Sequence, residues 1–276
     1  MRTPATLLAG VLLALSATNV AAGPRVYSLD QCADQYVLAL APRADIVGLS
    51  KRADDADSYM RAGARGLPLR RATAESVLAA RPDIVVRTWG GEANLAEALR
   101  RRGVRVVQIE DATDFAGIAR ETRRVAAALG QPAAGEALVR RMDGELAASA
   151  GAWRGAGALY LTPGGFTAGG GTLIDAILRG AGLSNLAGGE GFRSVSLERL
   201  VLEPPHAIVE GFFEAVYSAL QRWSPGRHQV LRRIAERRTL VSLPGRLVGC
   251  PAWYSADATA RIAAAAPKRG LSARPD

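Results

Sequence analysis

The sequence has 276 residues and a formal net charge of +9, and 49% of its residues are hydrophobic. A chain of this length and hydrophobicity can bury the core of one large domain or of two ordinary ones. Its arginines are spread over the whole chain with no basic tract interleaved with aromatic residues, so the composition argues against nucleic-acid binding and leaves anionic ligands as candidates.

Residues 1–22 have the pattern of a secretory signal peptide. Arg2 precedes the short apolar run Leu7–Leu15, and Val20, Ala21 and Ala22 are small residues suited to cleavage. The apolar run is too short to span a membrane. We therefore expect an exported, periplasmic protein that is cleaved near Ala22 and matures where disulfides persist.

The first half of the mature chain, residues 23–132, alternates short apolar runs with amphipathic stretches. Strands are predicted at 26–29, 46–49, 84–86 and 104–109, with helices at 73–80, 93–102 and 113–129. This alternation predicts a parallel sheet that is covered by helices on both faces.

Residues 133–153 are predicted to form one long helix that connects two globular halves. Apolar residues recur in it at steps of three and four, namely Ala134, Leu138, Met142, Leu146, Ala150 and Trp153. The same periodicity also fits an ordinary crossover helix within a single sheet. The pattern of the remaining chain favours the connecting helix.

The second half, residues 154–266, repeats the pattern of the first, and a polar tail of residues 267–276 follows it. Residues 73–86 align without a gap to residues 196–209, which places Glu75 on Glu198. Further along, Trp89 falls on Phe212, each just after a predicted strand. The simplest interpretation is two similar α/β halves of Rossmann type joined by one helix.

No catalytic centre can be assembled from the residue types present. The glycine-rich run 165–172 is close to a phosphate-binding loop, but Gly171 stands where that motif needs lysine. The only histidines are His206 and His228, and neither has a recognisable nucleophile or orienting partner in the sequence. We therefore expect a protein that is not an enzyme.

Aromatic residues follow the predicted strands of both halves. Open α/β sheets bind ligands at the carboxyl ends of their strands, so these aromatics predict an apolar cleft between the halves. The residues are Trp89, Phe166, Phe212, Trp253 and Tyr254.

Cys32 and Cys250 are the only cysteines, and both follow predicted strands that face the proposed cleft. In an exported protein they could form a disulfide, remain as two thiols that contact the ligand, or take part in a metal-assisted site. Two thiols alone cannot complete a zinc site. The sequence leaves these alternatives open.

Four stretches of the chain resemble the substrate-binding proteins of ABC importers for cobalamin and ferric siderophores. They are residues 25–29, residues 74–91 with Glu75 and Trp89, residues 163–169 with Phe166, and residues 195–209 with Glu198. The resemblance implies two lobes joined by a rigid helix and a ligand cleft lined by Trp89 and Phe166. It also implies that Glu75 and Glu198 dock the protein onto a membrane permease with its ATPase.

From these features the sequence predicts a monomeric binding protein that captures a metal chelate and delivers it to the permease. A corrinoid or a ferric siderophore is the expected ligand, with haem as a further candidate, and no cofactor of the protein's own is expected. Tyr59 and Arg87 complete the expected contact set, with Arg87 meeting a carboxylate or amide on the rim of the ligand. The alternatives are a two-lobed enzyme of the chelatase or nitrogenase-like kind and a ligand sensor.

Overall fold

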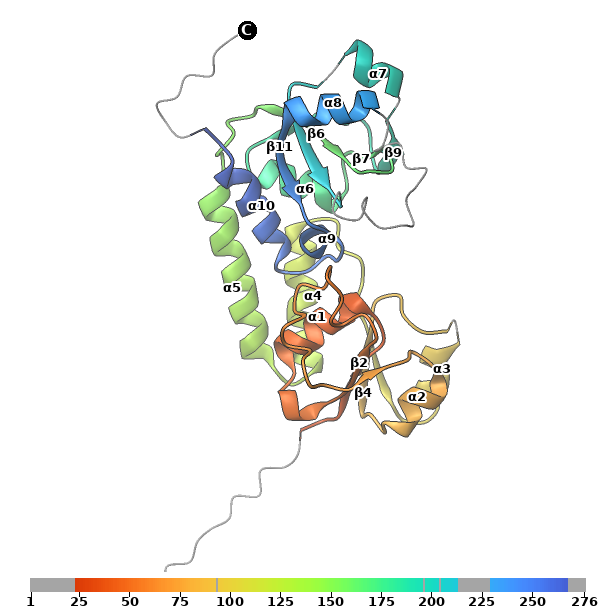
Figure 1. The fold of residues 1–276 in the computed structure, drawn as a ribbon. Coiled ribbons are helices and arrows are strands. Elements are labelled where there is room, and N and C mark those ends of the chain that lie inside the picture. The colour runs from red at the N-terminus through yellow and green to blue at the C-terminus, as the bar shows by residue number, and fades with distance from the viewer. Residues whose placement is uncertain (1–22, 93, 196, 204, 213–228, 268–276) are drawn as a thin grey trace, which may run out of the picture.

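The computed structural model describes residues 23–92, 94–195, 197–203, 205–212 and 229–267. The predicted signal peptide, His228 and the end of the tail lie outside these ranges. The described chain forms two α/β lobes that lie one above the other beside the long helix α5, Pro132–Ser149 (Figure 1). None of the described helices is long and apolar enough to cross a membrane.

The N-terminal lobe is built on a parallel sheet of strand order β3-β2-β1-β4-β5. The strands are β1 (Val26–Ser28), β2 (Ile46–Ser50), β3 (Leu69–Arg70), β4 (Ile84–Arg87) and β5 (Arg105–Gln108). The helices are α1 (Gln31–Leu40), α2 (Ala74–Ala79), α3 (Leu95–Arg100) and α4 (Phe115–Ala128).

Both faces of this sheet are buried, as the alternation of the sequence predicts. Val26 and Val86 pack in one core cluster, whereas Tyr27 and Val85 belong to a second cluster with Leu99 of α3. Successive strand residues point to opposite faces, and a parallel sheet needs helices on both.

The C-terminal lobe has a second parallel sheet of order β11-β10-β6-β8 and a two-stranded antiparallel ribbon of β7 and β9. Its strands are β6 (Gly157–Leu161), β7 (Phe166–Ala168), β8 (Ser184–Asn185), β9 (Phe192–Ser194), β10 (Ile208–Gly211) and β11 (Thr239–Leu243). The helices are α6 (Leu173–Gly180), α7 (Leu197–Leu202), α8 (Gln229–Arg238), α9 (Gly245–Val248) and α10 (Ser255–Ala264).

The connecting helix is shorter than predicted. It begins with Pro132 in its first turn and ends at Ser149, because Ala150 is extended and Gly151 takes a positive φ of 68°. Trp153, expected as the last residue of the apolar stripe, follows in a turn, where its indole Nε1 donates to the carbonyl of Ile262 at 2.8 Å.

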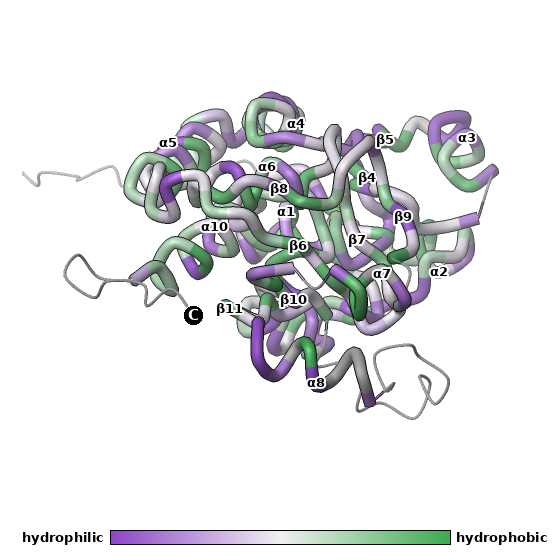
Figure 2. The backbone as a smooth tube through the Cα atoms, turned by 90° about the horizontal axis from the view of Figure 1, so that it is seen from above, coloured by the Kyte–Doolittle hydropathy of each residue, from purple (hydrophilic) through white to green (hydrophobic). Residues whose placement is uncertain are grey.

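The chain passes between the lobes a second time near its C-terminus. Figure 1 shows α9 between the lobes and α10 beside α5, and Figure 2 shows α10 next to α5 from above. Trp253 and Tyr254 pack in the core of the N-terminal lobe, whereas Ala258 and Ile262 pack in the core of the C-terminal lobe. We call residues 249–262 the C-terminal crossing. The segment expected to finish the second half therefore packs against both lobes.

Candidate functional site

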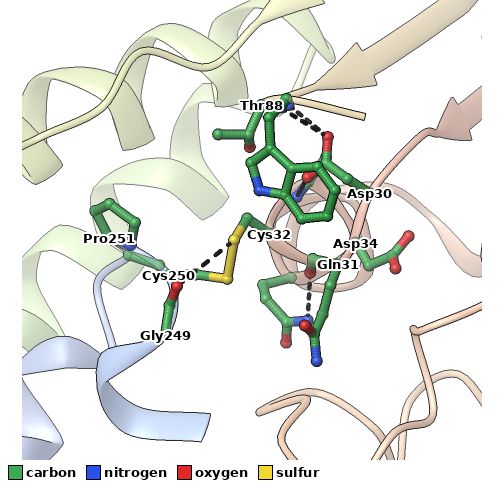
Figure 3. Close-up of a disulfide and its surroundings, with 12 residues drawn as sticks. Asp30, Gln31, Cys32, Asp34, Thr88, Gly249, Cys250 and Pro251 are labelled. Carbon is green, nitrogen blue, oxygen red and sulfur yellow. Dashed lines mark hydrogen bonds between the residues drawn. A yellow bond between two sulfur atoms is a disulfide. The ribbon is translucent and has the colours of Figure 1, made fainter. Parts of the chain in front are cut away.

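A disulfide joins the first turn of α1 in the N-terminal lobe to the start of the C-terminal crossing. Cys32 lies in the first turn of α1, directly after β1, and Cys250 follows α9, which comes directly after β11. The two residues are bonded with a Cα–Cα separation of 5.4 Å, although 218 positions separate them in the sequence (Figure 3). Of the three alternatives that the sequence leaves open, the disulfide is confirmed. It ties the C-terminal crossing to α1.

The buried carboxylate of Asp30 holds the loop that follows β4. One oxygen caps α1 by accepting from the Ala33 N–H at 2.9 Å. The other accepts from the N–H groups of Thr88, Trp89 and Gly90 at 2.7, 3.2 and 2.9 Å. Figure 3 shows Asp30 and Thr88 near the disulfide. The main chain of this loop is therefore fixed without help from the Trp89 side chain.

Gly90 lets this loop lie against β1. A Cβ at this position would lie 2.5 Å from the carbonyl oxygen of Leu29, a backbone atom that cannot move aside. Only glycine fits such a close approach of two backbones.

Trp89 and Phe166, predicted as pocket residues, are both exposed. Trp89 is 57% exposed and Phe166 48% exposed. The backbone of Phe166 is anchored to Thr162, whose N–H donates to the Phe166 carbonyl at 2.9 Å and whose Oγ1 accepts from the Phe166 N–H at 3.1 Å. Large exposed aromatic side chains on a firmly held backbone, one in the loop after β4 and one at the start of β7, are suited to stack on a ligand.

Phe212 and Phe192 add aromatic surface in the C-terminal lobe. Phe212, also predicted, is half-buried after β10 and has a positive φ of 62°, a strained conformation for an aromatic residue. Phe192, which the sequence did not indicate, is 68% exposed on β9. It lies opposite Ala168 in the ribbon, on the same face as Phe166.

Trp253 and Tyr254 do not line a cleft, contrary to the prediction. They are only 2% and 1% exposed, so neither ring offers a face to a ligand. The ring of Trp253 meets Tyr36 edge-on at 5.4 Å, and Tyr254 stacks on Tyr59 at 4.0 Å. Their position after a strand is explained by the C-terminal crossing, which brings them into the N-terminal lobe.

Tyr59, another aromatic residue of the expected contact set, is half-buried at the same junction. Its hydroxyl donates to Asp257 of α10 at 2.6 Å and accepts from Arg141 of α5 at 3.0 Å. Burial raises the pKa of the Tyr59 phenol, and the hydrogen bond to Asp257 raises it further. The phenol therefore keeps the proton that it donates, and Tyr59 connects the loop of the N-terminal lobe to both crossing helices.

Asp34 is a second buried carboxylate in the first turn of α1. Its oxygens accept from the Ser50 N–H at 2.9 Å and from the Ser50 hydroxyl at 2.5 Å, which fixes the end of β2 to α1. Burial raises the pKa of Asp34 from 3.8 to about 6, although the bonds from Ser50 act in the opposite direction.

Arg87 is half-buried at the end of β4. Its Nη2 donates to the Trp89 carbonyl at 3.3 Å, and its Nε is buried without a hydrogen-bond partner. The guanidinium group therefore lies against the Trp89 loop.

Glu75 and Glu198 are exposed in the first turns of α2 and α7, one on each lobe. Figure 1 shows both helices on the side of the molecule away from α5. Two carboxylates on one side of a two-lobed protein can reach one partner surface.

A hollow of about 720 Å³ lies elsewhere, between Asp45, Arg105 and the turn from α4 to α5. Arg105 begins β5, so this hollow lies at the amino ends of the strands, whereas the Trp89 loop lies at their carboxyl ends. We do not assign it to the candidate site.

Residues 26–211 match the sequence profile of the Periplasmic binding protein family, so the chain belongs to this family. The family-level prediction is thereby confirmed, and the match favours a binding protein over an enzyme. A search of curated proteins returned no match.

Solved structures with the same fold include three periplasmic binding proteins. The haem-binding protein RhuT from Roseiflexus sp. RS-1 has a TM-score of 0.68 and 23% identity, covering 88% of this chain and 98% of its own. A haem-binding protein from Pseudomonas aeruginosa has a TM-score of 0.65 and 27% identity, covering 89% and 93%. The vitamin B12-binding protein BtuF of Vibrio cholerae has a TM-score of 0.61 and 15% identity, covering 88% and 96%.

Proposed function

We propose that this protein is the exported substrate-binding protein of an ABC importer, and that it captures a metal chelate between its lobes and delivers it to a membrane permease. The observation that carries the proposal is the exposed indole of Trp89, on a loop whose main chain Asp30 fixes at three amides. A large apolar side chain held in solvent by a rigid loop is suited to bury a large apolar ligand.

The ligand is a bulky chelate such as a corrinoid, a ferric siderophore or haem. Trp89 in one lobe and Phe166, Phe192 and Phe212 in the other supply aromatic surface for a macrocycle or an aromatic chelator. The solved structures of similar fold are named for haem, vitamin B12 and a ferric hydroxamate transport system, which supports this class of ligand. Trp253, Tyr254 and Tyr59 have no part in the proposed contact set.

A fluorescence titration tests the proposal directly. The purified mature protein is titrated with cobalamin, with haem and with several ferric siderophores while tryptophan emission is recorded. We expect micromolar or tighter quenching by at least one chelate, and most of the quenching should disappear in Trp89→Phe. Binding of a sugar or an amino acid instead, with no response to any chelate, would contradict the proposal.

Delivery to the permease and its ATPase depends on Glu75 and Glu198 in this proposal. Exposed charges at the edge of an interface act mainly on encounter and register. The pair Glu75→Lys and Glu198→Lys should therefore abolish uptake in cells while the affinity for the chelate stays unchanged. The matched control reverses two other exposed carboxylates, Glu97 on α3 and Asp143 on α5, and should transport normally. Normal uptake by the first variant would remove the docking role.

A further inference from the structure

We infer that the transported chelate carries a carboxylate on its rim and that Arg87 is the residue that selects it. This inference rests on the proposed function and narrows the class of ligand. It separates chelates with acidic substituents, such as porphyrin carboxylic acids or carboxylate siderophores, from chelates whose rim is neutral.

Arg87 lies beside the surface on which the ligand stacks. It is the last residue of β4, and its bond to the Trp89 carbonyl keeps the guanidinium group at the base of the loop that carries the indole. A planar chelate that covers the Trp89 ring extends beyond the ring on every side. Its rim therefore comes within reach of a long side chain attached two residues earlier.

Most of the hydrogen-bond donors of the Arg87 guanidinium group are not used within the described part of the chain. Arg124 and Arg141 each bind a carboxylate, Glu121 and Asp257 respectively. Arg87, by contrast, forms no ion pair with any residue in the described part of the chain, and its one hydrogen bond is long. A half-buried arginine held this loosely keeps most of its five donors for an incoming group.

Unpartnered polar atoms at the same position point to a missing partner. Nε of Arg87 and Oγ1 of the adjacent Thr88 are both buried without a hydrogen-bond partner. The main chain of Thr88 is already used, because its N–H binds Asp30 and its carbonyl accepts from Gln108 Nε2. Buried polar groups are nearly always satisfied, so two consecutive exceptions beside an exposed tryptophan leave hydrogen-bonding capacity unused next to the surface on which the ligand stacks.

A carboxylate satisfies this position better than an amide. Its two oxygens match the planar fork of a guanidinium and accept two N–H bonds at once, and its charge compensates a cation that is partly removed from water. An amide oxygen accepts one bond and leaves the charge uncompensated. The site should therefore prefer an acidic rim over a neutral rim of the same shape.

Matched pairs of ligands test this preference. Zinc protoporphyrin IX is compared with its dimethyl ester, and a cobalamin monocarboxylic acid is compared with cobalamin, by quenching of tryptophan emission. On whichever scaffold binds, we expect the acid to bind about tenfold more tightly than its neutral partner. Arg87→Gln should reduce this ratio to about one. Arg87→Lys, which keeps the charge without the fork, should give an intermediate ratio.

The control variant is Arg102→Gln, which removes one positive charge from the same lobe. Arg102 is exposed between α3 and the start of β5, and within the described residues its side chain makes only a 3.4 Å bond to the Ala98 carbonyl. It should keep the wild-type ratio. Because the ratio is measured within each variant, a variant that fails to fold loses both ligands and is recognised.

Two results overturn the inference while the proposed function survives. One is equal binding of the acid and its neutral partner by the wild-type protein, and the other is an unchanged ratio in Arg87→Gln. If no chelate of either scaffold, and none of the siderophores, binds at all, the proposed function fails and the inference fails with it.

Discussion

Trp89 and Trp253 both follow a strand, and the sequence predicts the same role for both, but the structure uses them in opposite ways. Trp89 is 57% exposed, and its loop is held by main-chain bonds to Asp30. Trp253 is 2% exposed, and its segment is held by side chains, namely its own ring and the disulfide of Cys250. A loop anchored through its backbone leaves its aromatic ring available for a ligand, whereas a loop anchored through its aromatic ring does not.

The largest expected effect is on the stability of the protein when each of these two tryptophans is replaced by alanine. Trp253→Ala should lower the free energy of unfolding by about 3–5 kcal/mol, because it empties a packed site between Tyr36 and Tyr254. Trp89→Ala should change it by no more than about 0.5 kcal/mol, because the ring is largely in solvent. Urea unfolding followed by circular dichroism measures both values. Similar losses in the two variants would contradict the different roles of the two tryptophans.

The disulfide should have the next largest effect. The double variant Cys32→Ala and Cys250→Ala releases the C-terminal crossing from α1 and should lower the free energy of unfolding by about 2–4 kcal/mol. The reduced wild-type protein should show a loss of similar size. Chelate binding at saturating ligand should persist, because the Trp89 loop is fixed by Asp30 independently of the disulfide. An unchanged unfolding curve would show that the crossing is held by packing alone.

The sequence predicts the parts of the fold that depend on local pattern. The alternation of apolar runs and amphipathic stretches predicts both parallel sheets, and the apolar stripe around Leu138 and Met142 predicts α5. The pattern does not reveal the end of this helix, which depends on the conformation of Ala150 and Gly151. Nor does it reveal β7 and β9, because Phe166–Ala168 and Phe192–Ser194 mix polar and apolar residues and form no apolar run.

The parts of the site that could not be predicted depend on contacts between distant segments. Asp30 is recognisable as a helix cap, but its bonds to residues 88–90 join positions about 60 residues apart. Trp253 is buried by Tyr36 of α1, and nothing in its own neighbourhood in the sequence indicates this. A position just after a strand therefore predicts that a residue lies at the sheet edge, but not whether its ring faces the ligand or the core.

Asp34 allows a test by pH of the region that holds the Trp89 loop, because it lies one turn after Asp30, which binds that loop. Its pKa is raised from 3.8 to about 6, so the folded protein binds this proton more tightly than the unfolded chain. The bound proton therefore stabilises the folded protein. This contribution to the free energy of unfolding is greatest below pH 3.8, decreases as the pH rises to about 6 and is absent above that pH. Across this pH range the free energy of unfolding should fall by on the order of 2–3 kcal/mol.

Asp34→Asn should remove this pH dependence of the free energy of unfolding while it keeps the hydrogen bonds with Ser50. The amide oxygen accepts from the Ser50 N–H, and the amide NH₂ donates to the Ser50 hydroxyl. Urea unfolding between pH 4 and pH 8 should show the variant matching the wild type at the acid end and exceeding it at neutral pH. Asp54→Asn, at an exposed carboxylate, should follow the wild-type curve. Parallel curves for wild type and Asp34→Asn would contradict the raised pKa.

The smallest expected effect on stability concerns Tyr59, which contacts the C-terminal crossing. Tyr59→Phe keeps the ring that stacks on Tyr254 and removes only the hydroxyl between Asp257 and Arg141. Because these groups are partly exposed, the loss should be about 1 kcal/mol, and a double-mutant cycle with Asp257→Asn should give a coupling of about 0.5–1 kcal/mol. Chelate affinity should not change. If Tyr59→Phe instead weakens chelate binding and leaves unfolding unaffected, Tyr59 contacts the ligand, as its sequence position indicates, and the crossing is not fully separate from the site.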